Sequence, residues 1–322
     1  MLTYSLQRHF ILKQQSICLG HPNMKNNKAP HYLKNLINSD QDFVTIVENL
    51  IANDTQEQAQ LDKKDYQTAI ISACIGTGGL DLFKKVVADA IKEKVLSVVE
   101  IREIVYQSQA YTGLANTYAF VRELSKYLGK NEIKVPKTSE DQDPLSAEVR
   151  LAKGQEIQKT LFGTLPKIDE KDPAAVLQKL IRANCYGDFY SRPGLSLRLR
   201  ELSAFSILVA MGDTKEQLKA HIRANYVAGN EYLDLIKVIT AIVPFVGYVK
   251  AVNALGVLSL VKQDESVKPV VESKASLPST KKEATPSKKE EKEATAKTEV
   301  KPTEKVRTPV SQNQRNQSKK KH

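Results

Sequence analysis

Residues 195–212, LSLRLRELSAFSILVAMG, and residues 61–78, LDKKDYQTAIISACIGTG, are the two stretches that decide the fold of this chain. A shift of 134 residues lays one stretch over the other without a gap, and each ends on a glycine, Gly212 or Gly78. In the later stretch apolar side chains recur every three or four residues, which is the spacing of one face of an amphipathic helix. These side chains belong to Leu199, Leu202, Phe205 and Val209.

The same shift lays the whole of residues 61–128 over residues 195–262 and pairs Gly113 with Gly247, where the helical pattern breaks in both copies. The alternating pattern typical of strands is absent from the sequence. We therefore predict an all-α fold in which one helical module is used twice. Helices are expected at 31–50, 62–75, 80–94, 98–112 and 114–128, then at 148–162, 173–184, 195–210, 214–228, 232–246 and 248–261.

The two modules, residues 31–128 and 148–262, are flanked by segments of different composition. Residues 1–30 are polar and patternless, which predicts a poorly ordered segment, and residues 129–147 are a polar linker with two prolines. Residues 263–322 contain no aromatic residue but fifteen basic residues, nine acidic residues and five prolines. Such a segment cannot bury enough apolar surface to offset the entropy of ordering, so a disordered basic tail is predicted.

The distribution of charge and of cysteines argues against several classes of protein. The net charge is +11, and the tail holds six more basic than acidic residues. This placement favours a solvated tail over a folded nucleic-acid-binding face, with non-specific contact to polyanions as the alternative. The cysteines, Cys18, Cys74 and Cys185, are far apart and form no disulfide framework or zinc motif. No apolar run reaches the ~18–20 residues of a membrane span. We expect a cytoplasmic protein without a metal or other cofactor.

Several features of the second module, in their order along the chain, resemble the carboxymuconolactone decarboxylase family. The resemblance extends over roughly residues 31–128 and 148–262. The motifs that carry it are GQEI at 154–157, LFG at 161–163, YGDFYSRPGL at 186–195, REL at 200–202 and LKAH at 218–221, together with EIRE at 100–103, Gln107, Tyr111 and Gly113 in the first module.

This resemblance implies an all-α module with a central two-helix hairpin, and assembly into trimers or hexamers of modules. For this chain we expect a trimer of tandem modules, with the hexamer as the alternative. The family's activities include decarboxylation of a muconolactone, whereas its alkylhydroperoxidase D branch reduces peroxides through a C-x-x-C pair backed by Glu and His. In that branch the cysteine pair lies early on the helix that carries the His. Residues 211–217, MGDTKEQ, hold no cysteine there, so thiol peroxidase chemistry is disfavoured.

An acid–base pair is predicted instead. Glu201 precedes Gly212 by eleven residues and His221 follows it by nine, so both lie at nearly the same height of an antiparallel helical hairpin. Paired helices lie about 8–10 Å apart, which lets the two side chains meet. A carboxylate beside an imidazole raises its basicity and suits proton transfer. The alternatives are a hydrogen-bonded core histidine, and a buried Glu201 that serves as the partner of an arginine.

Three further residues are candidates for substrate binding. Arg192 is able to hold a substrate carboxylate bidentately, or else only braces the Pro193-Gly194 turn. Tyr190 and Tyr186 line the substrate pocket, or else are core residues.

In the first module, Gln67 stands opposite Glu201 and Val87 opposite His221, so the pair is absent there. This predicts a division of labour in which the first module is scaffold and the second holds any site. Two functions stay open. One is a cofactor-free decarboxylase-like enzyme that acts on a small carboxylate or lactone. The other is a non-catalytic helical assembly protein that uses its basic tail as a tether.

Overall fold

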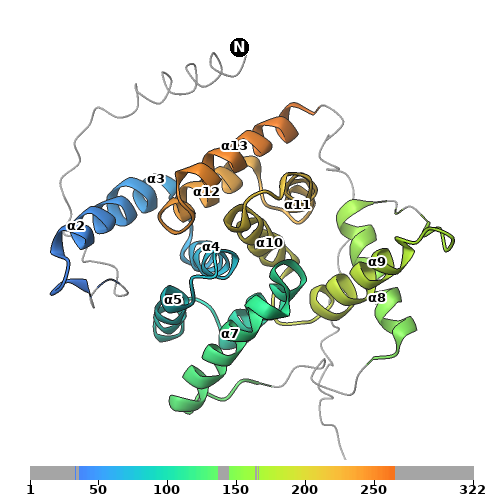
Figure 1. Cartoon of the computed structure of the whole chain (residues 1–322), viewed down its shortest axis with the longest axis horizontal. Coiled ribbons are helices and arrows are strands. Elements are labelled where there is room, and N and C mark those ends of the chain that lie inside the picture. Colours follow the sequence, from blue (N-terminus) through green and yellow to red (C-terminus); the bar gives the residue numbers. More distant parts are fainter. Residues whose placement is uncertain (1–32, 34–35, 137–144, 164, 166, 265–322) are drawn as a thin grey trace, which may run out of the picture. The chain divides into compact units, whose positions relative to one another are not determined.

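The structure is a computed structural model that describes residues 33, 36–136, 145–163, 165 and 167–264 (Figure 1). The described residues form helices joined by short turns, and no strand occurs among them, which confirms the predicted all-α class. Within these ranges no helix is both long and apolar enough to cross a membrane. The predicted N-terminal segment 1–30, the tail beyond Asp264 and the middle of the linker lie outside the described residues.

The helices form one set in the first half and another in the second half, and most begin and end close to the predicted positions. The helix expected at 31–50 instead begins at Gln41, and helical structure continues from it to Ala59. The first set is α2 (Gln41–Asn49), η2 (Leu50–Gln56), α3 (Glu57–Ala59), α4 (Lys63–Gly76), α5 (Leu80–Lys92), α6 (Val98–Gln107) and α7 (Gln109–Lys130). The second set is α8 (Ala147–Phe162), α9 (Ala175–Leu180), η4 (Ile181–Tyr190), α10 (Leu197–Met211), α11 (Lys215–Val227), α12 (Tyr232–Val246) and α13 (Tyr248–Gln263).

The 134-residue offset recurs in the backbone. α4 and α10 begin 134 residues apart, and so do α6 and α12. Gly113 and Gly247 both leave the helical region, with φ of 73° and 82° and ψ of 164° and 159°. Each half also contains one π-helical segment, η2 or η4. A duplicated module would be expected to produce these matching helix starts, glycine conformations and π-helical segments. The duplication itself stays a prediction.

α4 and α10 form the centre of the described structure (Figure 1). Both are apolar or small around most of their circumference, which is typical of a helix enclosed on all sides. Small side chains let the two backbones approach closely: Ser72 and Ser203 hydroxyls lie 2.8 Å apart. A Cβ added to Gly76 would stand 2.7 Å from both the Ala210 side chain and the Ile207 carbonyl oxygen. This contact ties the two halves into one core.

Helices preceding each central hairpin pack on the other half of the chain. η2 and α3 lie against α12, and η4 lies against α6. In the second half, α8 covers η4, and two glycines allow their backbones to touch. A Cβ on Gly154 would come within 1.7 Å of the Arg182 carbonyl oxygen, and one on Gly187 within 2.1 Å of the Arg150 carbonyl oxygen. Arg150 also binds Asp188 through two hydrogen bonds of 2.6 and 2.5 Å across the same contact.

Helical structure continues further than the sequence predicted before the Pro193-Gly194 break. The helix expected at 173–184 runs through η4 to Tyr190. Its end is closed by a wide turn in which Ser191 N donates to Tyr186 O. Insertion of one extra residue per turn rotates the following side chains relative to an α-helix. The two tyrosines that follow Cys185 therefore face the covered side of the segment, where both are buried.

The α8–η4 contact gives a test of packing. Gly154→Ala places a methyl group into the Arg182 backbone, and we expect it to lower the free energy of unfolding by about 3 kcal/mol, since overpacked backbone contacts have little room to relax. Urea unfolding measures this. The matched control is Gly256→Ala inside α13, where a Cβ meets nothing within 4 Å. That change should be neutral or stabilising by up to about 1 kcal/mol, and equal effects of both substitutions would contradict the described contact.

Candidate functional site

The side chains of Glu201 and His221 meet across the hairpin formed by α10 and α11. His221 Nδ1 lies 2.8 Å from Glu201 Oε2. Glu201 is fully buried and His221 is 7% exposed. A carboxylate accepts hydrogen bonds, so in the tautomer that bonds to it Nδ1 donates and Nε2 is the basic nitrogen. Their proximity agrees with the sequence argument, while a role in a reaction stays a prediction.

The turn between α10 and α11 sets this register. Gly212 has φ of +72° and Asp213 has φ of 55°, so the chain reverses through two residues in the left-handed region. The Thr214 hydroxyl donates to the Leu208 carbonyl at 2.9 Å and satisfies one of the last acceptors of α10. α11 then runs back along α10, which brings its second turn level with Glu201.

Asn225 holds the backbones of both members of the pair. Its side-chain amide donates to Glu201 O at 3.0 Å and to His221 O at 2.7 Å. Its own oxygen accepts from Asn230 at 2.8 Å, and Asn230 accepts from Arg198. Arg198 in turn binds Asp65 of α4 with both terminal nitrogens. A buried polar network therefore connects the pair to the first half of the chain, and such networks fix side-chain positions when every member is satisfied.

Aromatic rings enclose the open side of the imidazole. The Tyr111 ring lies edge-on to His221 with centroids 5.5 Å apart, and the Phe162 ring does so at 6.3 Å. Phe162 also packs against Tyr186 at 5.8 Å, and Tyr186 lies 5.1 Å from Tyr190. The wall thus combines residues of α7, α8 and η4, all of them separate from the helices that carry the pair.

Tyr111 comes from the first half and lies two residues before Gly113, where α7 leaves the helical conformation. Its hydroxyl lies 2.7 Å from the hydroxyl of Tyr190. Burial raises the pKa of Tyr111 and of Tyr190 well above the ordinary value of a tyrosine, and the Glu201 carboxylate adds to this in both. Both hydroxyls therefore stay protonated and can donate hydrogen bonds at neutral pH.

Cys185 packs against the same aromatic cluster. Burial, and after it the charge of Glu201, raises the pKa of its thiol to about 12. Burial alone raises the pKa of Cys74 to about 12. Because the thiolate is the reactive form, these raised pKa values disfavour a peroxidatic role for buried Cys74 and for half-buried Cys185.

Arg192 lies in a second polar cluster centred on Glu103 of α6. Its guanidinium donates to both carboxylate oxygens at 3.0–3.2 Å and stacks over the Tyr106 ring. Arg200, which is 1% exposed, donates to the same carboxylate at 3.1 Å and to Gln107. Burial lowers the pKa of Arg200, and the fully buried Glu103 offsets this. The guanidinium of Arg192 is thus already bound to a carboxylate of the chain itself.

Of the residues that the sequence singled out, the structure gathers four in one place: His221, Glu201, Tyr186 and Tyr190. Tyr111 and Phe162 belong to the motifs that carry the family resemblance, but the sequence analysis did not identify them as site residues. Tyr111 lies in the first half and contacts a site in the second half, and only the three-dimensional contact reveals this. The other contributors that were missed are Cys185, Asn225 and Glu103.

With this geometry in view, comparison with known families is informative. Residues 175–259 match the model of the Carboxymuconolactone decarboxylase family. The matched segment runs from α9 into α13 and includes Glu201, His221, Tyr186 and Tyr190. Tyr111 and Phe162, which complete the wall around the imidazole, lie outside the match. No curated protein matches the chain.

The described residues contain no group of three or more His, Cys, Asp and Glu side chains arranged to hold a metal ion. Two cavities of the described part of the chain, one between α5 and α7 and one lined by residues of α10, α11 and α13, are not bordered by His221. The imidazole is 7% exposed, with the rings of Tyr111 and Phe162 edge-on to it.

The buried thiols predict how stability depends on pH. An unfolded thiol ionises near pH 9.0, whereas folded Cys185 ionises near 12, so its contribution is complete below pH 9 and is lost as pH rises toward 12. At pH 10 this amounts to about 1 kcal/mol. Urea unfolding under reducing conditions at pH 8 and 10 should show a loss in the free energy of unfolding that is about 1 kcal/mol smaller in Cys185→Ala. Cys74→Ala should behave alike, and an unchanged pH dependence in both would contradict the burial.

Proposed function

We propose that the chain is a carboxymuconolactone decarboxylase-like enzyme that uses His221 and Glu201 for cofactor-free proton transfer on a small carboxylate or lactone. The observation that carries this proposal is the 2.8 Å contact between a fully buried carboxylate and an imidazole within an aromatic wall. The family match over residues 175–259 supports it.

An unsatisfied acceptor supports a ligand beside the pair. Glu201 Oε2 contacts His221, but Glu201 Oε1 has no hydrogen-bond donor among the described residues although it is buried. A buried carboxylate oxygen without a donor costs of order 1–3 kcal/mol or more. Asn225 binds the Glu201 backbone rather than this oxygen. A substrate hydroxyl or a water molecule would supply the missing hydrogen bond.

The chemistry follows from the tautomer. With Nδ1 bonded to Glu201, protonation of Nε2 gives an imidazolium stabilised by an adjacent carboxylate. In a decarboxylation, the bond to the carboxyl carbon breaks, carbon dioxide leaves, and the electron pair passes into a conjugated carbonyl of the substrate. The imidazolium then delivers its Nε2 proton to the carbon that lost the carboxyl group. The protonated tyrosines are placed to hold a developing enolate oxygen by hydrogen bonds.

The sequence analysis predicts that Arg192 anchors a substrate carboxylate. Its guanidinium already donates to both carboxylate oxygens of Glu103, so a substrate carboxylate would have to bind alongside Glu103. A more direct role is to hold η4 against α6, which positions Tyr190 two residues upstream. We propose that Arg192 acts on binding through this placement as well as through any contact with the substrate.

Turnover by the His221→Gln variant tests the proposal. A panel of unsaturated lactone acids and dicarboxylic acids is incubated with the full chain, and carbon dioxide release and deuterium incorporation are measured. We expect His221→Gln to lower the rate on a turned-over compound by about 10²–10⁴-fold, the usual contribution of a general acid or base. Glu201→Gln should lower it less, because the imidazole remains.

The control for this test is Lys215→Gln, an exposed change on the same helix, which should leave the rate unchanged. Thermal unfolding of each variant separates lost chemistry from lost folding. A rate retained within threefold in a folded His221→Gln variant would exclude the acid–base role. It would favour the second candidate, a non-catalytic helical assembly protein whose basic tail serves as a tether or contacts polyanions.

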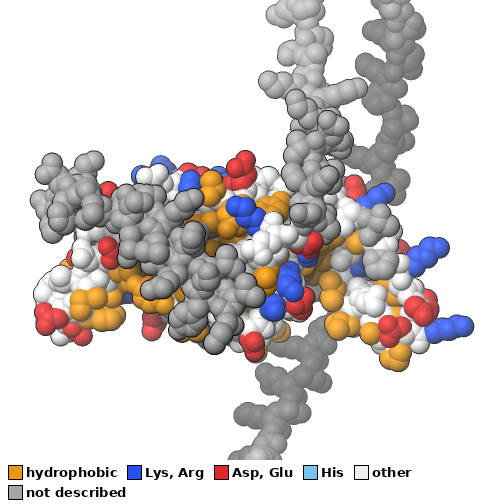
Figure 2. Space-filling view, turned by 90° about the horizontal axis from the view of Figure 1, so that it is seen from above, with side chains coloured by type: hydrophobic (Ala, Val, Ile, Leu, Met, Phe, Trp, Pro, Cys, Tyr) orange, Lys and Arg blue, Asp and Glu red, His pale blue; other side chains and the backbone are white. Residues whose placement is uncertain are grey.

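Matching exposed apolar faces support the predicted trimer of tandem modules. On α2, Phe43 is 49% and Ile46 is 68% exposed; at the corresponding positions on α9, Leu177 is 61% and Leu180 is 55% exposed. Apolar side chains reach the surface at the left and right of Figure 2, the sides on which Figure 1 places α2 and α9. Large exposed apolar side chains gathered on one face are typical of an interface. We also place the protein in the cytoplasm, as the lone buried thiols suggest.

Sedimentation equilibrium tests this assembly. We expect the wild-type chain to have three times the monomer mass. Leu177→Glu combined with Leu180→Glu should yield the monomer, because the trimer would have to desolvate six new carboxylates, two from each chain. Leu233→Glu, at an equally exposed leucine of α12, serves as the control and should keep the trimer. A monomeric wild-type chain, or a double variant of unchanged mass, would rule out α9 as the interface.

A further inference from the structure

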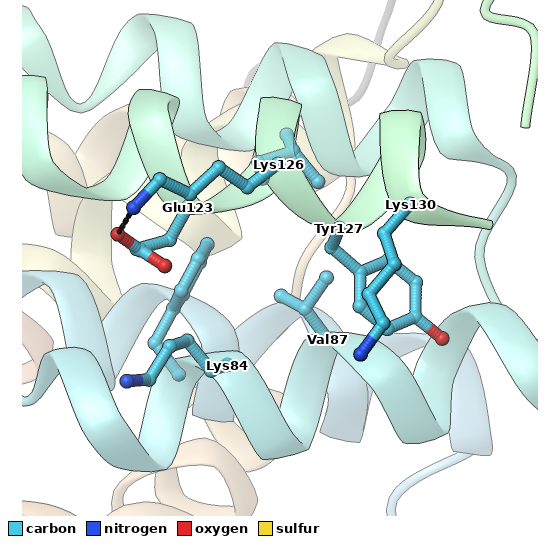
Figure 3. A pocket seen from close by; sticks show the side chains of 8 residues that line it. Lys84, Val87, Glu123, Lys126, Tyr127 and Lys130 are labelled. Atoms are coloured by element: carbon cyan, nitrogen blue, oxygen red, sulfur yellow. Dashed lines mark hydrogen bonds and ion pairs between the residues drawn. The ribbon is translucent and has the colours of Figure 1, made fainter. Parts of the chain in front are cut away.

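A slot lies between α5 and α7, away from the pair of His221 and Glu201. Its volume is about 190 Å³. In Figure 3, Lys84 and Val87 project from α5, and Glu123, Lys126, Tyr127 and Lys130 project from α7. Phe83 and Leu124 complete the lining.

The floor of the slot is apolar and rigid. Phe83, Val87 and Leu124 are between 1% and 4% exposed. The Phe83 ring is fixed by an edge-on contact with Phe120 at 4.9 Å. A dry cavity of about 150 Å³ accepts a benzene ring, so this slot has room for one ring or a chain of about six carbons.

The rim of the slot is basic. Lys84 pairs with Asp81 at 2.5 Å and Lys126 with Glu123 at 3.1 Å, and both lysines are largely solvated. Lys130 makes no ion pair with any of the described residues. Figure 3 shows Lys84 and Lys130 on either side of Val87, so the apolar floor lies between two ammonium groups. An anion at the mouth of the slot would meet positive charge from both ends.

The fold itself does not require this basic rim. At the 134-residue offset, the positions of Lys84, Lys126 and Lys130 are taken by Leu218, Leu260 and Asp264. The corresponding helices α11 and α13 pack together without lysines at these places. Lysines at these three places therefore belong to the first half alone.

We propose that this slot binds a small amphiphile with a carboxylate head and an apolar body of one ring or about six carbons. The body fills the space over Val87 and Phe83, and the carboxylate lies between Lys84 and Lys130. No His, Cys or Asp borders the slot, and its one carboxylate, Glu123, is paired with Lys126. The slot therefore binds its ligand without transforming it. This inference does not depend on the function proposed for His221.

A titration of the full chain with hexanoate and with hexanamide, followed by ligand-observed NMR, tests the proposal. The two probes share the apolar body and differ in charge. Hexanoate should bind at least fivefold more tightly than hexanamide, and its affinity should fall as salt is raised. Lys84→Gln combined with Lys130→Gln should lower the affinity for hexanoate roughly fivefold, which is the effect expected when two partly solvated charges are removed. Both lysines are exposed enough for the variant to fold.

The control is Lys92→Gln, an exposed lysine of α5 outside the slot, which should leave hexanoate affinity unchanged. His221→Gln should also bind hexanoate as the wild type does. Binding lost in His221→Gln but kept in the double lysine variant would place the ligand at the pair and overturn the proposal. Equal affinity for both probes, or no measurable binding of hexanoate at millimolar concentration, would overturn it as well.

Discussion

The close contact of α4 with α10 is the constraint on which the remaining structure depends. Two helices approach this closely only where small residues face one another, as Ser72 does Ser203 and Gly76 does Ala210. Both helices are then enclosed, so every polar group on them needs a partner within the protein. Arg198 meets this need by reaching from α10 to Asp65 of α4, and the hydrogen bonds that continue from it end at the candidate site. The position of Glu201 and His221 therefore depends on the contact between the two halves.

The burial of the site explains which residue types form it. Glu201 is fully buried, and a buried carboxylate is tolerated only with a partner, which His221 provides. The wall around the imidazole takes Tyr111 from one half and Phe162 from the helix that leads into the other. Neither half would build this environment alone. The first half is therefore more than a passive scaffold, because it supplies one ring of the wall and, through Glu103, the partner of Arg192.

Much of this architecture was predictable from the sequence, and the part that was not has a physical reason. Helical spacing and paired glycines gave the helices and the hairpin, because periodicity and turn residues are local signals. The proximity of Glu201 and His221 followed from counting residues on either side of Gly212. The π-helical turn that buries Tyr190 was not predictable, since one extra residue in a turn leaves no distinct pattern. Nor was the contribution of Tyr111, because contacts between halves depend on packing rather than on spacing.

Under the predicted duplication, the two halves have diverged in opposite directions. Where the second half holds Glu201 and His221, the first has Gln67 and Val87, so it has no ionisable group at either position. Val87 instead forms the floor of a slot with lysines at its mouth. Under the two proposals made above, the second half would move a proton and the first half would bind a ligand. α7 carries Tyr111 before its break at Gly113 and Lys130 at its end, so this segment contributes to both places.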